Sequence, residues 1–169
     1  MKLKLKYSLP SIASSLSVLI VTLVVTVSLF VMPVWSADYN KQSLINEDLS
    51  NQDLTDASFD HTNLRDSNLS FSKASGVRFF GANLNNANLE GMDLRYASLE
   101  SARLTGANLA DAMLEGAYMT NALFKGTNIA GADFTDALLS PTAERELCEI
   151  ASGTNSTTGR ETKSTLYCP

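Results

Sequence analysis

The chain has 169 residues, of which 44% are hydrophobic and 18% charged, and this balance excludes a disordered polyelectrolyte. Three of the basic residues lie within the first six positions, and no acidic residue precedes Asp38. From Asp38 onward, ten basic residues stand against 18 acidic ones, a formal net charge of −8. Because nucleic acids and anionic lipids are bound by clusters of cations, a surface this acidic disfavours both as partners.

The first 37 residues have the layout of an export signal. Lys2, Lys4 and Lys6 are followed by a segment without Asp, Glu, Lys, Arg or His that includes the apolar run 18–34. We expect cleavage after Ser36 or Ala37, and no Arg-Arg pair precedes the apolar run, which favours the general secretory route. The alternative is an uncleaved membrane anchor, because the run is nearly long enough to span a bilayer. Either way, the remainder of the chain is exported.

A five-residue repeat follows without interruption. Every fifth residue from Leu44 to Leu139 gives twenty positions, of which thirteen are Leu and four are Phe. The position two residues earlier is Ala in eleven of the twenty units and Ser or Thr in four. Because residues two apart on an extended backbone point to the same side, the large and the small residue of each unit face one interior. This regularity predicts an all-β solenoid.

The position two residues after each large residue predicts a corner. Fifteen of these twenty positions hold Gly, Asn or Asp, the residues that tolerate tight or left-handed backbone angles. The position between the small and the large residue is Asn or Asp in ten units, and it must point outward. Each unit is therefore predicted to be a very short strand followed by a corner.

The unit Ala-Asn-Leu-x-x, as in the stretch 81–91, resembles the pentapeptide repeat family, and the resemblance covers about residues 42–140. It implies a right-handed quadrilateral β-helix with four units per coil, and hence about five turns for twenty units. We expect the β-helix over residues 38–141 and a small helical cap over 142–169.

Charges spaced twenty residues apart support four units per coil. Lys73 lies twenty residues from both Asp53 and Asp93, and Arg95 lies twenty residues before Glu115. These opposite charges would stack in adjacent coils, which is favourable. A coil of three units would instead stack two acidic residues fifteen apart in the sequence, Glu100 and Glu115.

The pattern breaks at both ends and in the middle. Gln42, Glu47 and Gln52 occupy the first three small positions, so we expect a solvated or frayed first turn. Ala74 replaces a large residue near Val77, and local repacking explains this exchange. The alternative is that Phe71 and Phe80, both expected to point outward, form a site facing a partner.

Late in the repeat, four outward middle positions are apolar: Met113, Tyr118, Leu123 and Leu138. We expect the C-terminal segment to cover these side chains.

The cap is predicted to begin with a helix. Ser140 as N-cap and Pro141 at the first helical position start it, Leu147, Ile150 and Ala151 form its apolar face, and Gly153 ends it. Thr162 is expected to cap a last short turn that carries Leu166.

The sequence has two cysteines, Cys148 and Cys168, and both lie in the predicted cap. In an exported protein we expect them to form a disulfide, and in a cytosolic one they would remain free thiols. The tail over residues 147–168 also resembles that of lumenal pentapeptide repeat proteins from cyanobacteria and chloroplasts. This resemblance implies the thylakoid lumen, with the periplasm as the next expectation.

No catalytic, cofactor or metal site is predicted. His61, the only histidine, stands at a corner without a second ligand nearby in the sequence, and carboxylate pairs such as those of glycosidases arise from the repeat itself. We therefore expect a non-enzymatic scaffold that binds an unidentified protein, without nucleic acid, and with a membrane only through an uncleaved N-terminal segment. The alternative, for a cytosolic protein, is a DNA mimic that binds a topoisomerase, as some members of the family do.

Overall fold

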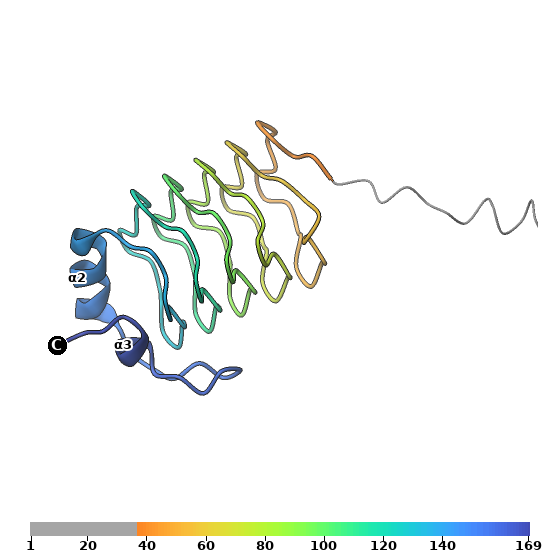
Figure 1. Cartoon of the computed structure of the whole chain (residues 1–169). Helices are drawn as coiled ribbons and strands as arrows, with labels where there is room; N and C mark the ends of the chain where they lie inside the picture. Colours follow the sequence, from red (N-terminus) through yellow and green to blue (C-terminus); the bar gives the residue numbers. More distant parts are fainter. Residues whose placement is uncertain (1–36) are drawn as a thin grey trace, which may run out of the picture. The chain divides into compact units, whose positions relative to one another are not determined.

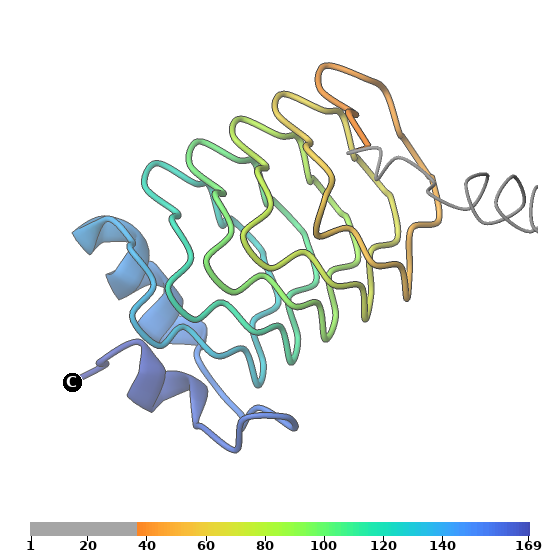
Figure 2. The ribbon, with the colours of Figure 1, turned by 45° about the vertical axis from the view of Figure 1, so that its right-hand side comes forward.

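The computed structural model describes residues 37–169, so the predicted export signal lies almost entirely outside the described residues. The chain from Asp38 to Leu139 winds into stacked coils, which are seen side-on in Figures 1 and 2. Single-residue parallel bridges join each coil to the next, from Asp38 with Ser58 to Tyr118 with Leu138, and every bridge in this series connects residues twenty apart. Each coil therefore contains four five-residue units, and the alternative of three units per coil is excluded.

The corners lie where the sequence predicts them. Among residues 41–136, every fifth residue from Lys41 has a positive φ except Asp56. Nearly every corner is closed by a turn in which the N–H of the next small residue donates to the carbonyl of the preceding large residue, as Ala87 does to Leu84 at 3.1 Å. A positive φ at the third residue of such a turn explains the preference for Gly, Asn and Asp.

The large residues form the core. From Leu54 to Phe134 all of them are buried, including Ala74, and the rings of Tyr39, Phe59 and Phe79 stack with centroids 5.0 and 4.9 Å apart. Each buried Leu or Phe contributes about 1.5 to 3 kcal/mol before the loss of chain entropy. Around Ala74, the larger side chains Val77 and Met92 are buried at positions that elsewhere hold Ala, as local repacking requires.

Serine and threonine replace alanine at small positions without leaving a polar group unpaired. The hydroxyls of Ser67, Ser72 and Thr127 are buried, and each donates to the carbonyl oxygen of the large residue three positions earlier at 2.6 to 2.7 Å. That carbonyl already closes the corner, so the hydroxyl uses its second lone pair.

The first coil is solvated but not frayed. Gln42, Glu47 and Gln52 are exposed, and the first two large residues of the repeat are only partly buried. The backbone of this coil is nevertheless paired, since the carbonyl of Gln42 accepts from Asn63 N–H at 2.8 Å and that of Glu47 from Asn68 N–H at 2.9 Å. Among residues 37–169 no coil precedes this one, so polar side chains at these small positions reach solvent.

Two helices form the cap at the other end: α2, Pro141–Ile150, and α3, Thr162–Thr165 (Figure 1). As predicted, the Ser140 hydroxyl accepts a hydrogen bond from Ala143 N–H, at 3.2 Å. Leu147 and Ala151 are buried, but Ile150 is exposed, because Ala143 rather than Ile150 completes the buried face of α2.

Two further details of the predicted cap are wrong. α2 ends at Ile150, before Gly153, and Gly153 instead allows the chain to pass the rod closely: a Cβ there would lie 2.9 Å from the nitrogen of Gly131. Thr162 is the first residue of α3 rather than its cap, which is Glu161, although Leu166 is buried as expected. Within residues 37–169 no helix combines the length and apolarity needed to cross a membrane.

Candidate interaction surfaces

The outward middle residues stand in four columns, because each is bridged to the residue twenty positions later, and these columns define four faces of the rod. They are the asparagine face (Asp48, Asn68, Asn88, Asn108, Asn128), the charged face (Asp53, Lys73, Asp93, Met113, Asp133), the tyrosine face (Ser58, Arg78, Ser98, Tyr118, Leu138) and the arginine face (Ser43, Asn63, Asn83, Arg103, Leu123).

The asparagine face is a ladder of amides. Asn128, Asn108, Asn88 and Asn68 each donate from Nδ2 to the side-chain oxygen one coil earlier, over 2.9 to 3.3 Å. Their oxygens also accept the backbone N–H two residues on, for example that of Ala130 at 3.2 Å. The ladder ends at Asp48, where hydrogen bonds from Ser50 and Asn68 lower the pKa of the carboxyl. Since these amides bond one another and the backbone, this face stabilises the rod.

Residues twenty apart are bridged on the charged face as predicted, but the closest ion pair on this face joins two residues of the same coil. Lys73 is bridged to both Asp53 and Asp93, as expected from the spacing of twenty. Arg95, however, binds Asp93 in its own coil through two hydrogen bonds of 2.6 and 2.8 Å. These bonds lower the pKa of Asp93 and raise that of Arg95, which the charge of Glu115 raises further.

The loop between α2 and α3 folds back along the rod and is held there by polar contacts (Figure 1). Asn155 is buried, and its Nδ2 donates to the carbonyls of Gly131 and Asp111 at 2.9 and 3.0 Å. Arg160 reaches Glu115 at 2.8 Å and Asp133 at 3.2 Å. Because Asn155 meets the backbone of two successive coils, the loop clamps the last coils together.

Asp133 is the buried carboxylate of this contact. Burial raises its pKa, but hydrogen bonds from Thr135 and the positive charge of Arg160 outweigh burial, so the pKa lies below the ordinary value of 3.8. The Thr135 hydroxyl donates to it at 2.6 Å. The carboxylate is therefore charged at neutral pH and attracts the loop through Arg160.

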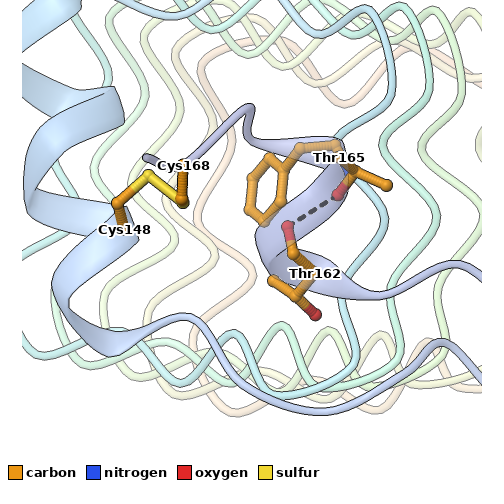
Figure 3. The surroundings of a disulfide bond; sticks show 5 residues. Cys148, Thr162, Thr165 and Cys168 are labelled. Atoms are coloured by element: carbon orange, nitrogen blue, oxygen red, sulfur yellow. Dashed lines mark hydrogen bonds between the residues drawn. A yellow bond between two sulfur atoms is a disulfide. The ribbon is translucent and has the colours of Figure 1, made fainter.

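A disulfide joins Cys148 in α2 to Cys168, just beyond α3, with a Cα–Cα separation of 5.6 Å (Figure 3). Beside it, Thr165 donates its hydroxyl to the carbonyl of Thr162 at 2.9 Å and accepts from Phe134 N–H at 3.1 Å. The disulfide thus connects two elements of the cap, and Thr165 connects α3 to the last coil. Such a bond indicates an oxidising compartment.

The structure does not bring Phe71 and Phe80 together. Phe71 occupies a corner, whereas Phe80 precedes the corner at Gly81, which lies two corners further along the coil. Their positions are thus near diagonally opposite edges of a four-sided coil. Phe71 is exposed, whereas Phe80 is half-buried and packs edge-on against His61, with centroids 5.3 Å apart. A partner-facing role stays a prediction for each residue separately.

Bulky corner residues depend on a glycine one coil later. A methyl group at Gly81, Gly91 or Gly116 would lie 2.6 Å from the ring of His61, Phe71 or Tyr96, respectively. Each ring therefore lies across the corner twenty residues on, where only glycine leaves room. The sequence contains this signal as an aromatic residue or His followed by Gly after twenty residues, and the five-residue pattern alone does not reveal it.

The expected covering of the late apolar positions is wrong for three of the four. Tyr118, Leu123 and Leu138 are exposed, and Met113 is half-buried. The physical reason is the route of the C-terminal segment: Asn155 and Arg160 bind the corner at Asp111 and the charged face, so the loop does not reach the tyrosine and arginine faces.

Within residues 37–169, no group of three His, Cys, Asp or Glu side chains is arranged to hold a metal ion. His61 contacts an aromatic ring. The protein is a solenoid of four-sided coils, closed at one end by a disulfide-linked cap, with polar groups along its faces. Repeat proteins of this kind bind partners through their extended surfaces rather than in a cleft.

The chain belongs to the pentapeptide repeat family. The family model for pentapeptide repeats matches in eight copies over residues 40–70, 75–109 and 102–140. Membership implies that the four-sided coils form a right-handed quadrilateral β-helix, and proteins of this family are generally structural or binding proteins without enzymatic activity. No curated protein sequence matches the chain.

Solved structures include similar proteins. A pentapeptide repeat protein from the thylakoid lumen of Arabidopsis thaliana is 38% identical, with a TM-score of 0.58, and the match covers 79% of this chain and 90% of that protein. A pentapeptide repeat protein from the cyanobacterium Nostoc PCC 7120 is 25% identical over 75% of this chain and 96% of that protein, with a TM-score of 0.49.

Proposed function

We propose that this protein is a non-enzymatic scaffold of an oxidising, exported compartment, the thylakoid lumen first and the periplasm next, where a rod of about five coils binds another protein. The observation that carries this proposal is the similarity to the thylakoid-lumen protein from Arabidopsis thaliana, which extends over 90% of that protein. The disulfide between Cys148 and Cys168 supports it, because cytosolic reductants would keep these thiols reduced.

The rod also has properties that a scaffold needs. Its faces are long and flat, and the ladder on the asparagine face holds successive coils in register. One end is closed by the cap, so the unpaired edge of the last coil does not invite end-to-end association. A rigid surface loses little entropy on binding, which favours recognition of a protein partner.

The test is the intact mass and amino terminus of the protein recovered from its native cells, before and after reduction and alkylation. We expect the chain to start at Ala37 or Asp38 and Cys148 and Cys168 to be labelled only after reduction. Labelling of both thiols without reduction in a soluble protein that begins at Met1 would contradict the proposal and favour the DNA mimic. A processed chain whose thiols are free would contradict the oxidising compartment alone.

A further inference from the structure

One edge of the rod carries four exposed large side chains next to one another, and we call them the tyrosine patch: Tyr96, Tyr118, Leu138 and Tyr167. Their exposed fractions are 58%, 46%, 54% and 71%. They include three of the five tyrosines of the chain. Isolated exposed apolar residues are common, but a cluster of this size on a soluble protein indicates a binding surface.

The register of the coils makes the patch continuous. Tyr118 and Leu138 are bridged to each other and occupy successive places on the tyrosine face. The ring of Tyr96 lies across Gly116, two residues before Tyr118. The hydroxyl of Tyr167 donates to Asp136 at 3.4 Å, and Asp136 lies two residues before Leu138. Tyr167 and Leu138 also line the same hollow. Residues from three coils and the cap therefore meet at one place.

The patch is rigid, and this favours binding. Tyr96 sits at a corner with a positive φ, and its ring is restricted by the backbone of the next coil. Tyr167 lies two residues after the end of α3 and directly precedes the disulfide-bonded Cys168, so the cap constrains it. Tyrosines that are held in place lose little side-chain entropy on binding and are among the residues that most often dominate the affinity of interfaces.

The charges around the patch are mainly acidic, and Arg95, the residue before Tyr96, is paired with Asp93. Asp136 binds Tyr167, Glu100 lies two residues after Ser98, below Tyr118, and Glu144 lines the hollow that Leu138 and Tyr167 share. The three stretches of the rod that form the patch, 96–101, 116–121 and 136–140, contain no Lys or Arg. Lower on the same face, Arg78 is paired with Asp60. Lys163 and Arg145 line the neighbouring hollow beside the disulfide, which Glu144 also lines.

From this combination we propose that the tyrosine patch is the docking surface for a protein segment that carries apolar side chains flanked by Lys or Arg. The apolar side chains would pack against the tyrosine rings and Leu138, and the cations would meet Asp136, Glu100 and Glu144. A second copy of this chain would place one acidic rim opposite another, which disfavours self-association. This inference rests on the proposed binding function and specifies its site and the chemistry of its partner.

The test uses the oxidised protein purified from its native cells and a blocked peptide of alternating leucine and lysine as the probe. We expect calorimetry to detect binding that weakens as salt increases, and Tyr118→Ser and Leu138→Ser to weaken it about tenfold each. Leu123→Ser is the matched control, because Leu123 is as exposed as Leu138, at 54%, but lies on the arginine face, and this variant should bind the peptide as the unchanged protein does. All variants must keep the melting temperature of the unchanged protein.

Three outcomes would overturn this inference. The first is equal binding of a leucine–glutamate peptide, which would remove the role of charge. The second is a failure of the leucine–lysine peptide to bind, or a loss of binding in Leu123→Ser but not in Tyr118→Ser. The third is a dimer, or binding to neutral lipid vesicles, that Tyr118→Ser abolishes. None of these outcomes affects the mass and labelling results, so the proposed scaffold function can stand while its site is rejected.

Discussion

The two ends of the rod differ in how they keep the apolar core from being exposed to solvent. In the first coil the small positions hold Gln42, Glu47 and Gln52, which are exposed, and within the described part of the chain this coil pairs with the coil that follows it. At the other end the last large residues are followed by α2 and α3, which bring Leu147 and Leu166 into the core. A solenoid end can therefore be stabilised either by becoming polar or by being covered.

The difference shows how stability is distributed along the rod. Most coils share one pattern of backbone hydrogen bonds to the next coil. The two ends therefore differ mainly in side-chain burial and in the contacts of the cap. In repeat proteins each unit contacts only its neighbours, so we expect unfolding to begin at the open end and the cap to delay unfolding from the other.

The largest effect should come from removing a core leucine between the two ends. Leu109→Ala should destabilise the protein by about 2 to 5 kcal/mol, because Leu109 is fully buried between coils and the cavity cannot collapse. Leu49→Ala, in the same column but partly buried in the first coil, should cost less than half as much. Denaturant unfolding measures both variants, and equal losses would show that the open end is as well packed as the middle.

Opening the disulfide should weaken the capped end. Cys148→Ser with Cys168→Ser removes a link across a sequence separation of 20 residues, and the chain-entropy model gives a loss of about 3 kcal/mol. Hydrogen exchange should become faster in α2, α3 and the last coil, while exchange in the first coil stays unchanged. Faster exchange in the first coil would mean that the two ends unfold together.

A corner in the middle of the rod should be less tolerant than one near the cap. Gly91→Ala should destabilise by about 1 to 3 kcal/mol, because alanine disfavours a positive φ and its methyl group would meet the ring of Phe71. Gly126→Ala has the same backbone cost, but a methyl group there contacts nothing within 4 Å. When Phe71→Ala is added to Gly91→Ala, the double variant should regain the stability that Gly91→Ala loses beyond Gly126→Ala. No such gain would show that the ring of Phe71 is not the obstacle.

The smallest effect should be the response of the capped end to acid. The pKa of Asp133 is lower in the folded protein than in the unfolded chain. The charge of Asp133 therefore contributes its full stabilisation at pH values above the unfolded-state pKa, and this contribution is lost as the pH falls through the folded-state pKa. We expect the melting temperature to stay constant from neutral pH to mildly acidic pH and then to fall below about pH 4. Asp133→Asn should reduce that fall, and an identical fall in the variant would assign it to other carboxylates.

Most of the rod could be predicted from the sequence because its determinants are local and repeat. The large and small positions, the corners and the register of twenty residues all follow from the five-residue pattern and from the charges around Lys73. The start of α2 at Ser140 and Pro141 also follows from local signals. The disulfide agrees with the expectation that the two cysteines of an exported protein would pair.

The cap and the exposed surfaces could not be predicted in the same way, because the cap does not repeat. Ile150 and Gly153 have different roles from those expected, since the position of α2 depends on how it meets the last coil. Asn155 and Arg160 direct the loop to the charged face, and this route leaves Tyr118 and Leu138 exposed.

The sequence by itself thus determines the coil, because every unit repeats the same local choice of inward, outward and corner residues. Only the tertiary structure decides which outward residues are covered and which corners accept an aromatic ring. The physical reason is that these features depend on contacts between residues twenty or more positions apart. Tyr96 lies across Gly116, and Asn155 reaches the backbone of Asp111, and no five-residue pattern contains either contact.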